Sequence, residues 1–339
     1  MSVTIKDVAK LVGVSASTVS RTCSNHPSIS EKTKEKVRKA MKELGYEPNF
    51  QASNLVSKNS KTLGVILPVA ENHLYQNSFF LEVIHGICQA CIKENYMNTI
   101  ISGNSEDELL NSVKSVIKSG KVDGFILLYS KEEDSILEYL NKTKQIYAII
   151  GKPSKEINST IYIDNDNITA GKDATDYLIE LGHKKIGFLY TKGNRIFVQD
   201  RKAGYISALI EKEIEFKKEY CLEKNLTIEK DILEIQELFL SEDFPSAIIA
   251  LDDIMALSLE KILSSINREV PEDVSIITFN NSLLTTLTNP QLTCIDINNY
   301  QLGWEGASQI IKHIQNPNLV PTKIIVPHKI IERDSCKKY

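Results

Sequence analysis

Short hydrogen-bonding side chains and one arginine gather in a single stretch near the N-terminus. The candidates are Thr4, Ser15, Ala16, Ser17, Thr18, Ser20, Arg21 and Asn25. These residues are small or can form hydrogen bonds, and such side chains suit base edges and phosphate oxygens. Ser17 and Arg21 are one helical turn apart, so both can reach the same groove. The stretch therefore predicts a surface that binds DNA.

Two predicted helices joined by a tight turn position these residues. Apolar residues recur at helical spacing from Ile5 to Val12, and Gly13 follows where a helix ends in a left-handed cap. Ser15 is placed to cap a second helix, with Val14 before it as a hydrophobic staple. A helix-turn-helix of this kind places the polar face of its second helix in the major groove.

A third helix is predicted between Ser30, its N-cap, and Gly45, where it ends before Pro48. Its polar face is basic and carries Lys32, Lys34, Lys36, Arg38, Lys39 and Lys42. Residues 1–60 contain 10 Lys and Arg against 5 Asp and Glu, a formal charge of +5, whereas residues 61–339 contain 30 against 39, a charge of −9. A basic run is most often only a solvated helix face, but a basic head on an acidic body suits contact with phosphates.

These residues, in this order, resemble the N-terminal signature of the lactose/galactose repressor family. The matching stretches are Val3–Ala9, Gly13–Ser15, Thr18–Arg21 and Lys36–Asn49. The resemblance implies a transcriptional regulator that binds double-stranded operator DNA as a homodimer. It also implies a hinge helix within residues 49–57, of which Ala52 and Leu55 enter the minor groove and bend the duplex.

The hinge segment departs from the family at Ser53, where relatives commonly have arginine, and this difference removes one possible phosphate contact. A short helix is marginal alone in water, because isolated helices below roughly 12–15 residues rarely persist. We therefore expect the segment to fold only on DNA. The alternative is an inert linker, which is the better interpretation for Ser57–Lys61.

Length and composition exclude several classes of protein. The 339 residues suffice for a small head and a two-lobed body. No apolar run approaches the ~18–20 residues of a membrane span, and no signal peptide precedes the first helix, so we expect a soluble, cytoplasmic protein with no membrane partner. Cys88 and Cys91 have the spacing of a redox or metal pair, but they lie on an apolar helical stripe. We predict no metal and no cofactor.

From residue 62 onward, predicted strands alternate with predicted helices in two series, which predicts two lobes with parallel sheets. The resemblance covers essentially the whole chain. The expected fold is therefore a small all-α helix-turn-helix head plus an α/β body, similar to periplasmic binding proteins, of two doubly wound parallel-sheet lobes. The expected boundaries are 1–48 for the head, 49–61 for the hinge and linker, and 62–339 for the effector-binding and dimerisation domain. Within the body, the first lobe is expected at about 62–162 and 290–322, and the second at about 163–289 and 323–333.

The resemblance implies that a small effector binds between the lobes, beyond the carboxyl ends of the parallel strands. The candidate effector residues are Phe79, Phe80, Asp164, Phe197, Arg201, Asp252 and Asn280. Arg201 matches the family arginine that contacts the effector, and its five-donor fork suits vicinal hydroxyls or a carboxylate. The alternative for Arg201 is a surface ion pair with Asp200. Relatives often have aspartate at the position of Asn280, which weakens that match.

Three shorter stretches resemble the maltose/maltodextrin repressors of Gram-positive bacteria. They are Leu74–Phe80, Leu128–Asp134 and Asp164–Asn167. Aromatic rings together with carboxylates and amides make a sensible pocket for a glucosyl sugar. The resemblance thus implies a repressor that such a sugar releases from DNA.

Two other functions stay open. A catabolite-type regulator would use a phosphorylated carrier protein as co-repressor, and no residue pattern identifies a surface for that protein. A sugar-modifying enzyme could use the same two-lobed body, but the sequence contains no G-x-G-x-x-G, G-x-x-x-x-G-K-[ST], G-x-S-x-G or H-E-x-x-H motif. No heptad pattern follows the last predicted strand, which favours a dimer over a tetramer.

Overall fold

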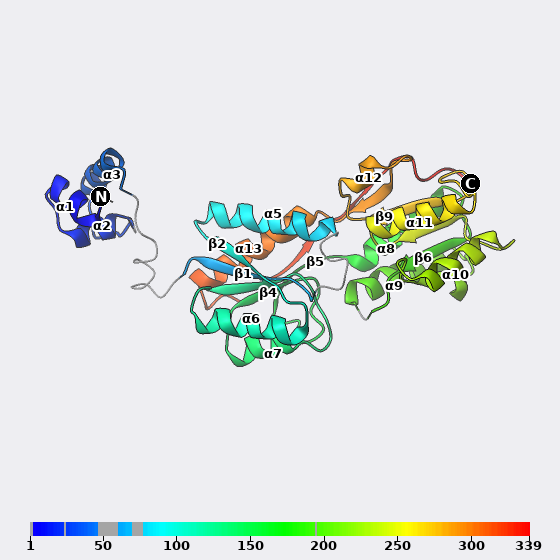
Figure 1. The fold of residues 1–339 in the computed structure, drawn as a ribbon, viewed down its shortest axis with the longest axis horizontal. Coiled ribbons are helices and arrows are strands. Elements are labelled where there is room, and N and C mark those ends of the chain that lie inside the picture. The colour runs from blue at the N-terminus through cyan, green and yellow to red at the C-terminus, as the bar shows by residue number, and fades with distance from the viewer. Residues whose placement is uncertain (1–2, 24, 47–59, 70–76, 194) are drawn as a thin grey trace. The chain divides into compact units, whose positions relative to one another are not determined.

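The computed structural model describes residues 3–23, 25–46, 60–69, 77–193 and 195–339. The chain divides into two compact units, residues 1–60 and residues 61–339. The first unit is a three-helix domain, and the second contains two successive sheets with helices packed on them (Figure 1). This architecture confirms the expected fold class. The predicted hinge helix, with Ala52 and Leu55, lies outside the described residues.

The first unit consists of α1 (Ile5–Val12), α2 (Ala16–Cys23) and α3 (Glu31–Leu44). Each helix contributes one fully buried valine to a shared core, and these are Val8, Val19 and Val37. Gly13 ends α1 in the left-handed conformation at φ 73°, and the Ser30 side chain caps α3 by accepting from the backbone N–H of Thr33. The helix-turn-helix predicted from these residues is confirmed.

One residue of the predicted basic face of α3 does not lie on that face. Lys34 is only 4% exposed, because it lies one turn before Val37 on the buried side of the helix. Its stem packs in the core and its ammonium group pairs with Glu31 at 2.7 Å. The basic residues of this face that are exposed are Lys32, Lys36, Arg38, Lys39 and Lys42.

The second unit contains two six-stranded sheets, with strand orders β11-β5-β4-β3-β1-β2 and β12-β10-β9-β8-β6-β7. Neighbouring strands are parallel except for β12, which runs antiparallel to β10. The first sheet is built from β1 (Thr62–Ile66), β2 (Met97–Ile101), β3 (Gly124–Leu127), β4 (Tyr147–Ile150), β5 (Ile161–Asn165) and β11 (Lys323–Val326). The second is built from β6 (Ile186–Tyr190), β7 (Cys221–Glu223), β8 (Ala247–Ala250), β9 (Ser275–Phe279), β10 (Thr293–Asp296) and β12 (Lys329–Ile331).

Helices bury both faces of these sheets. They are α5 (Ser78–Lys93), α6 (Glu106–Lys118), α7 (Ser135–Lys142), α8 (Asn167–Glu180), α9 (Ile196–Glu211), α10 (Glu229–Leu240), α11 (Asp253–Ser265), α12 (Leu284–Leu287) and α13 (Asn299–Gln315), with a 3-10 turn at Lys218–Tyr220. Alternate residues of β3 show the two faces, because Phe125 and Leu127 enter one core and Ile126 enters another. This double burial explains why the strands read as continuous apolar runs.

Three strands differ from the expected division of the lobes. β5 and β11 lie wholly in the first sheet, and β10 lies in the second. The expected boundaries, which split β5 and placed 290–322 in the first lobe and 323–333 in the second, were therefore wrong at these strands. An apolar run predicts a buried strand but not its neighbour, and β11 pairs with a strand about 160 residues earlier, at Lys323 opposite Tyr162.

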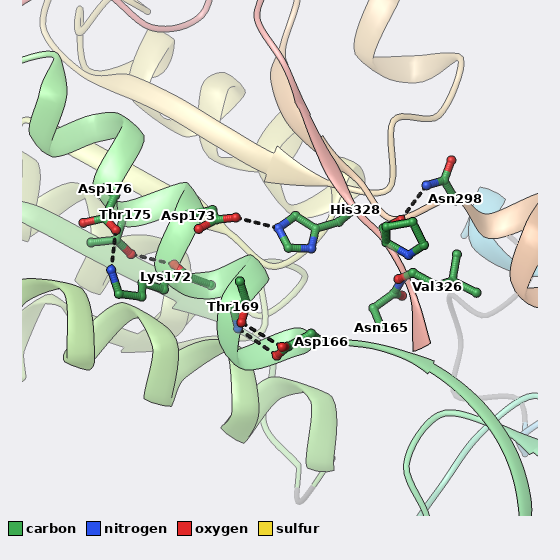
Figure 2. A network of polar contacts seen from close by, with 12 residues as sticks. Asn165, Asp166, Thr169, Lys172, Asp173, Thr175, Asp176, Asn298, Val326 and His328 are labelled. Carbon is green, nitrogen blue, oxygen red and sulfur yellow. Dashed lines mark hydrogen bonds and ion pairs between the residues drawn. The ribbon is translucent and has the colours of Figure 1, made fainter. Parts of the chain in front are cut away.

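The chain crosses between the sheets three times, from β5 to α8, from β10 to α13 and from β11 to β12. One buried side chain joins all three crossovers. Asn165, at the end of β5, donates from Nδ2 to the carbonyl oxygens of Ile297 at 2.9 Å and of Val326 at 2.8 Å. Figure 2 shows Asn165 beside Val326, with His328 of the third crossover bonded to Asp173 of α8 at 2.8 Å. The crossovers therefore form one hydrogen-bonded junction.

Glycines permit very close contact within two helix pairs. A Cβ on Gly171 of α8 would lie 2.1 Å from the carbonyl oxygen of Arg201 on α9. A Cβ on Gly303 of α13 would lie 1.9 Å from the carbonyl oxygen of Val83 on α5. Because backbone atoms make these contacts, no side-chain rotation could relieve a clash. The backbone that carries Arg201 is therefore held directly against α8.

Candidate functional site

The DNA-binding candidates lie mostly on the surface of the head. Thr4, Ser15, Ser17, Ser20, Arg21 and Asn25 are exposed, whereas Ala16 and Thr18 are half-buried. Ala16 packs against the core of the head, so part of its side chain has a structural role. The polar face of α2 is therefore available to a partner, and Ser17 and Arg21 lie one turn apart on it.

The first turn of α2 is held by its own hydroxyl groups. Ser15 Oγ accepts from the backbone N–H of Thr18 at 3.1 Å and lies 2.7 Å from Ser17 Oγ. Ser15 Oγ also lies 2.9 Å from Thr18 Oγ1, so its one donor and two acceptor positions are all occupied, whereas the Ser17 hydroxyl keeps positions for a phosphate or a base edge. The cap therefore occupies Ser15 and leaves Ser17 to the candidate contact surface.

Two candidates outside α2 have defined partners, Thr4 directly before α1 and Asn25 shortly after α2. Thr4 donates from Oγ1 to Asp7 Oδ2 at 2.7 Å, and this hydrogen bond is the main reason why the pKa of Asp7 is lowered. Asn25 has a left-handed backbone at φ 51°, and its Oδ1 accepts from Arg38 Nη2 at 3.0 Å. The side-chain NH₂ group of Asn25 can still donate to a further acceptor.

The candidate effector arginine lies where the strand order of the second sheet reverses. β6 neighbours β8 there, and α9 follows β6 in the chain. Arg201 of α9 donates from Nη1 to the carbonyl oxygen of Leu251, directly after β8, at 3.1 Å. Ligands of open α/β sheets bind at such a switch point, beyond the carboxyl ends of the strands.

Arg201 is 4% exposed and its guanidinium is enclosed by aromatic rings. The guanidinium carbon lies 3.8 Å from the ring centre of Phe279 and 5.0 Å from that of Phe197. Nε donates to Asn167 Oδ1 at 3.0 Å. In the part of the chain that the structure describes, the Nη2 group donates to no protein atom, so it remains available to a ligand.

Two carboxylates share the electrostatic environment of Arg201. Burial raises the pKa of Asp164 to about 6, and the charge of Arg201 opposes this rise. Burial also raises the pKa of the half-buried Asp252 and lowers that of Arg201 to about 10, so the guanidinium stays charged at neutral pH. The guanidinium can donate hydrogen bonds to a polar ligand, and the carboxylates can accept them.

The alternative for Arg201, a surface ion pair with Asp200, is wrong. Arg201 is buried, and Asp200 Oδ2 lies 3.3 Å from Lys152 Nζ instead. Lys152 follows β4 of the first lobe, whereas Asp200 lies on α9 of the second. This ion pair therefore bridges the lobes beside the candidate effector residues.

The remaining candidates lie at the border of the lobes. Phe79 packs against the cores of both lobes, Phe80 against that of the first lobe, and their rings meet edge to face at 5.2 Å. Buried Asn280 follows Phe279 and has φ 91°, and its carbonyl oxygen accepts from Asn299 Nδ2 at 3.1 Å. The structure thus brings Asp164, Phe197, Arg201 and Asp252 together, with Asn280 next in sequence to a ring of the site.

Sequence reasoning missed two residues that hold Arg201. In the sequence, Asn167 stands at the end of the Asp164–Asn167 stretch, and Phe279 ends a mostly apolar run. Asn167 begins a helix only three residues after the candidate Asp164, which lies at the end of a strand, and this closeness in sequence was a usable signal. Nothing in the sequence distinguishes Phe279 from an ordinary core residue.

The described residues include no group of three His, Cys, Asp or Glu side chains placed to hold a metal ion. Cys88 and Cys91 lie on α5, where burial raises the pKa of Cys91 to about 12 and Asn98 Nδ2 lies 3.3 Å from Cys88 Sγ. Among the helices of the described ranges, none has the length and apolar character that crossing a membrane requires.

Comparison with known proteins yields matches over nearly the whole chain. Residues 4–49 match the family of bacterial regulatory proteins of the lacI type, and residues 175–336 match the periplasmic binding protein-like domain. The HTH-type transcriptional regulator MalR of Staphylococcus xylosus is 35% identical over 333 residues, which cover 98% of each chain.

Two solved structures are also similar. A probable maltose operon transcriptional repressor from Staphylococcus aureus is 30% identical with a TM-score of 0.75, and the match covers 82% of this chain and 98% of that one. The complex of the transcriptional regulator CelR with cellobiose is 25% identical with a TM-score of 0.75, covering 98% and 99% of the two chains.

Proposed function

The chain belongs to the lacI family of bacterial regulatory proteins, and we propose that it is a repressor which a maltose-like or maltodextrin-like sugar releases from operator DNA. The family consists of DNA-binding transcription regulators, so this helix-turn-helix protein is a transcription regulator rather than an enzyme. The identity of the sugar, the operator and the residues that contact them belong to the proposal.

The buried guanidinium of Arg201, with an unengaged Nη2 group, is the observation that carries the sugar proposal. Phe197 and Phe279 supply apolar faces around it, and Asp164 and Asp252 supply acceptors for hydroxyl groups. Sugars combine apolar C–H faces with hydroxyl edges, and this chemistry matches both kinds of group. The similarity to a CelR structure with bound cellobiose and to maltose repressors supports the glucosyl class.

The exposed face of α2 supports binding in the major groove of an operator. Ser17 and Arg21 are placed to set operator specificity, and the exposed lysines of α3 increase affinity for phosphates in general. Affinity should therefore fall steeply as salt concentration rises. We further propose that Ala52 and Leu55 form the minor-groove wedge of a hinge helix that folds on DNA, and that the protein acts in the cytoplasm.

Exposed apolar side chains of the first lobe support a homodimer. Leu81 on α5 is 68% exposed, and Met97 and Ile100 on the edge strand β2 are 70% and 51% exposed. Large apolar side chains exposed on an edge strand and on a neighbouring helix suit an interface between two copies. A symmetric pair of heads would match a near-palindromic operator, because two-fold protein symmetry is mirrored in paired half-sites.

Calorimetry and operator binding with Arg201→Ala test the proposal. Loss of a buried charged donor should cost roughly 1.5–3 kcal/mol of affinity for maltose or maltotriose. Operator affinity without sugar should stay near that of the wild type. Arg268→Ala is the matched control, because Arg268 also stacks on a phenylalanine, Phe244 at 4.5 Å, but follows the far end of α11.

The outcomes separate the parts of the proposal. Equal loss of sugar affinity in Arg201→Ala and Arg268→Ala would show a general folding defect and remove Arg201 from the site. A wild-type protein that binds neither maltose, maltotriose nor cellobiose would contradict the sugar class. Operator binding that a phosphorylated carrier protein strengthens, with no response to sugars, would replace the proposal by the catabolite-type alternative.

A further inference from the structure

We propose that Asn167 is a positioning residue that couples ligand occupancy at Arg201 to the junction between the two lobes. The inference rests on the proposed function for its ligand and deepens it, because it names how one site is regulated. Asn167 is buried, with only 3% of its surface exposed. Its role follows from the two groups that its amide joins.

The amide of Asn167 connects a cation to an anion. Its Oδ1 accepts from Arg201 Nε at 3.0 Å, and its Nδ2 donates to Asp164 Oδ1 at 3.1 Å. Only one orientation of the amide satisfies both neighbours, because guanidinium N–H groups only donate and an ionised carboxylate only accepts. The position of the Arg201 side chain is therefore tied to the first crossover, in which Asp164 and Asn167 both lie.

The same short segment connects to the other two crossovers. Asn165 lies between Asp164 and Asn167, and its Nδ2 donates to the carbonyl oxygens of Ile297 and Val326. Figure 2 shows Asn165 beside Val326. Asn167 Nδ2 also lies 3.4 Å from the carbonyl oxygen of Asn165. Residues 164–167 thus connect to Arg201 through Asn167 and to the other two crossovers through Asn165.

This connection gives an effector a physical means to favour one lobe arrangement. Rotation of the lobes must change backbone angles in the crossovers, because these are the covalent links between the sheets. Any such change alters where Asn167 places the guanidinium. A ligand that binds best to one placement of Arg201 therefore binds best to one lobe arrangement, which is the condition for a shift between two states.

Asn167→Ala in the full-length protein tests the coupling. The measured quantity is the ratio of operator dissociation constants with and without saturating maltotriose. We expect this ratio to fall by about threefold to tenfold in the variant, which is the range expected when a residue between two sites is removed. Operator affinity without sugar should change by less than twofold. Thr175→Val is the matched control, since Thr175 is buried on the same helix and its hydroxyl bonds only within that helix, to Gly171.

Hydrogen exchange of the sugar-free protein provides a second measurement that does not depend on the ligand class. We expect amides in segments 161–167, 293–299 and 323–331 to exchange about tenfold faster in Asn167→Ala than in Thr175→Val. Faster exchange at all three crossovers, in a protein whose operator binding no sugar changes, would support the role of Asn167 in coupling and contradict the proposed effector. Unchanged exchange at the crossovers would overturn the proposal that Asn167 couples Arg201 to the junction. A ratio of operator dissociation constants that stays at the wild-type value under saturating sugar would also overturn the proposal. Asn167 would then contribute only to the affinity for the sugar.

Discussion

The head and the interlobe site hold their functional side chains in opposite ways. In the head, Ser15, Ser17 and Thr18 bond to one another within three residues of sequence, and the serines stay exposed. At the interlobe site, Arg201 is buried and its partners are 34 and 50 residues away. Local interactions thus form the proposed DNA-binding surface, whereas packing between distant elements forms the proposed effector site.

The difference has a functional reason. A surface that reads DNA must project its groups outward, so a short rigid helix with satisfied caps is sufficient. A site that responds to a small ligand must remove polar groups from water and still leave some unengaged. Such an arrangement is costly unless tertiary contacts hold every other polar atom.

Gly171→Ala should have the largest effect, and it should be confined to the body. The new Cβ would lie 2.1 Å from the carbonyl oxygen of Arg201, so α8 and α9 must separate. We expect the body to lose about 3 kcal/mol of unfolding free energy, together with most of its sugar affinity. Thermal unfolding and calorimetry measure these two quantities. A variant with wild-type sugar affinity would show that the α8–α9 contact does not place Arg201.

Asp164→Asn should stabilise the body at neutral pH. The pKa of Asp164 is about 6 in the folded protein, above its ordinary value of 3.8, so the folded state binds the proton more tightly. Wild-type stability from this group is thus fully present below about pH 4 and is lost as pH rises through 6. We expect a gain of about 2–3 kcal/mol in the variant at pH 7.5 that disappears near pH 4.

The control for this pH dependence lies in the head. The pKa of Asp7 is lowered by hydrogen bonds from Thr4, so its contribution to stability is present at neutral pH and is lost as pH falls. The stability difference between Asp7→Asn and the wild type should therefore stay constant above about pH 4 and shrink only below it. The difference for Asp164→Asn should instead grow as pH rises from about 4 to 8, so denaturant titrations from about pH 2 to 8 distinguish the two variants. Parallel curves for the two variants would contradict the difference in burial on which the comparison depends.

Val19→Ala should weaken the head and leave the interlobe site intact. Val19 is fully buried in a core to which each helix contributes only one such valine. Removal of its methyl groups should cost about 2 kcal/mol, and operator affinity should fall with the stability of the head. Regional hydrogen exchange and fluorescence anisotropy with operator DNA measure the effect. A matching loss of sugar affinity would show that the two units do not fold independently.

Gly13→Ala should have the smallest effect, because only local strain is involved. Gly13 has φ 73°, and a Cβ there would meet no atom within 4 Å. The expected cost is about 1 kcal/mol of head stability, from the left-handed backbone alone. The same exchange and anisotropy measurements apply. A loss as large as that of Val19→Ala would mean that the turn makes tertiary contacts that the structure does not contain.

Local patterns in the sequence predicted the elements of this protein well where short-range interactions decide them. Gly13 and Ser30 mark helix ends, and α1 begins and ends where its apolar spacing indicates. The alternation of apolar runs and helices likewise predicted two parallel-sheet lobes. The predicted basic face of α3 was wrong at Lys34, because a long side chain can bury its stem while its charge pairs at the helix surface.

The family resemblance is the source of the proposal that Arg201 contacts an effector. The sequence alone determined the helix-turn-helix and the α/β class of the body. These depend on residue type and on spacings of a few residues, which any short window contains. Only the tertiary structure decided the lobe of β5, β10 and β11, the Lys152–Asp200 bridge, and the roles of Asn167 and Phe279. Those features join residues as far as 161 positions apart, as in the Asn165–Val326 hydrogen bond. Contacts at that separation form only when packed sheets and helices bring the segments together, so no local pattern records them.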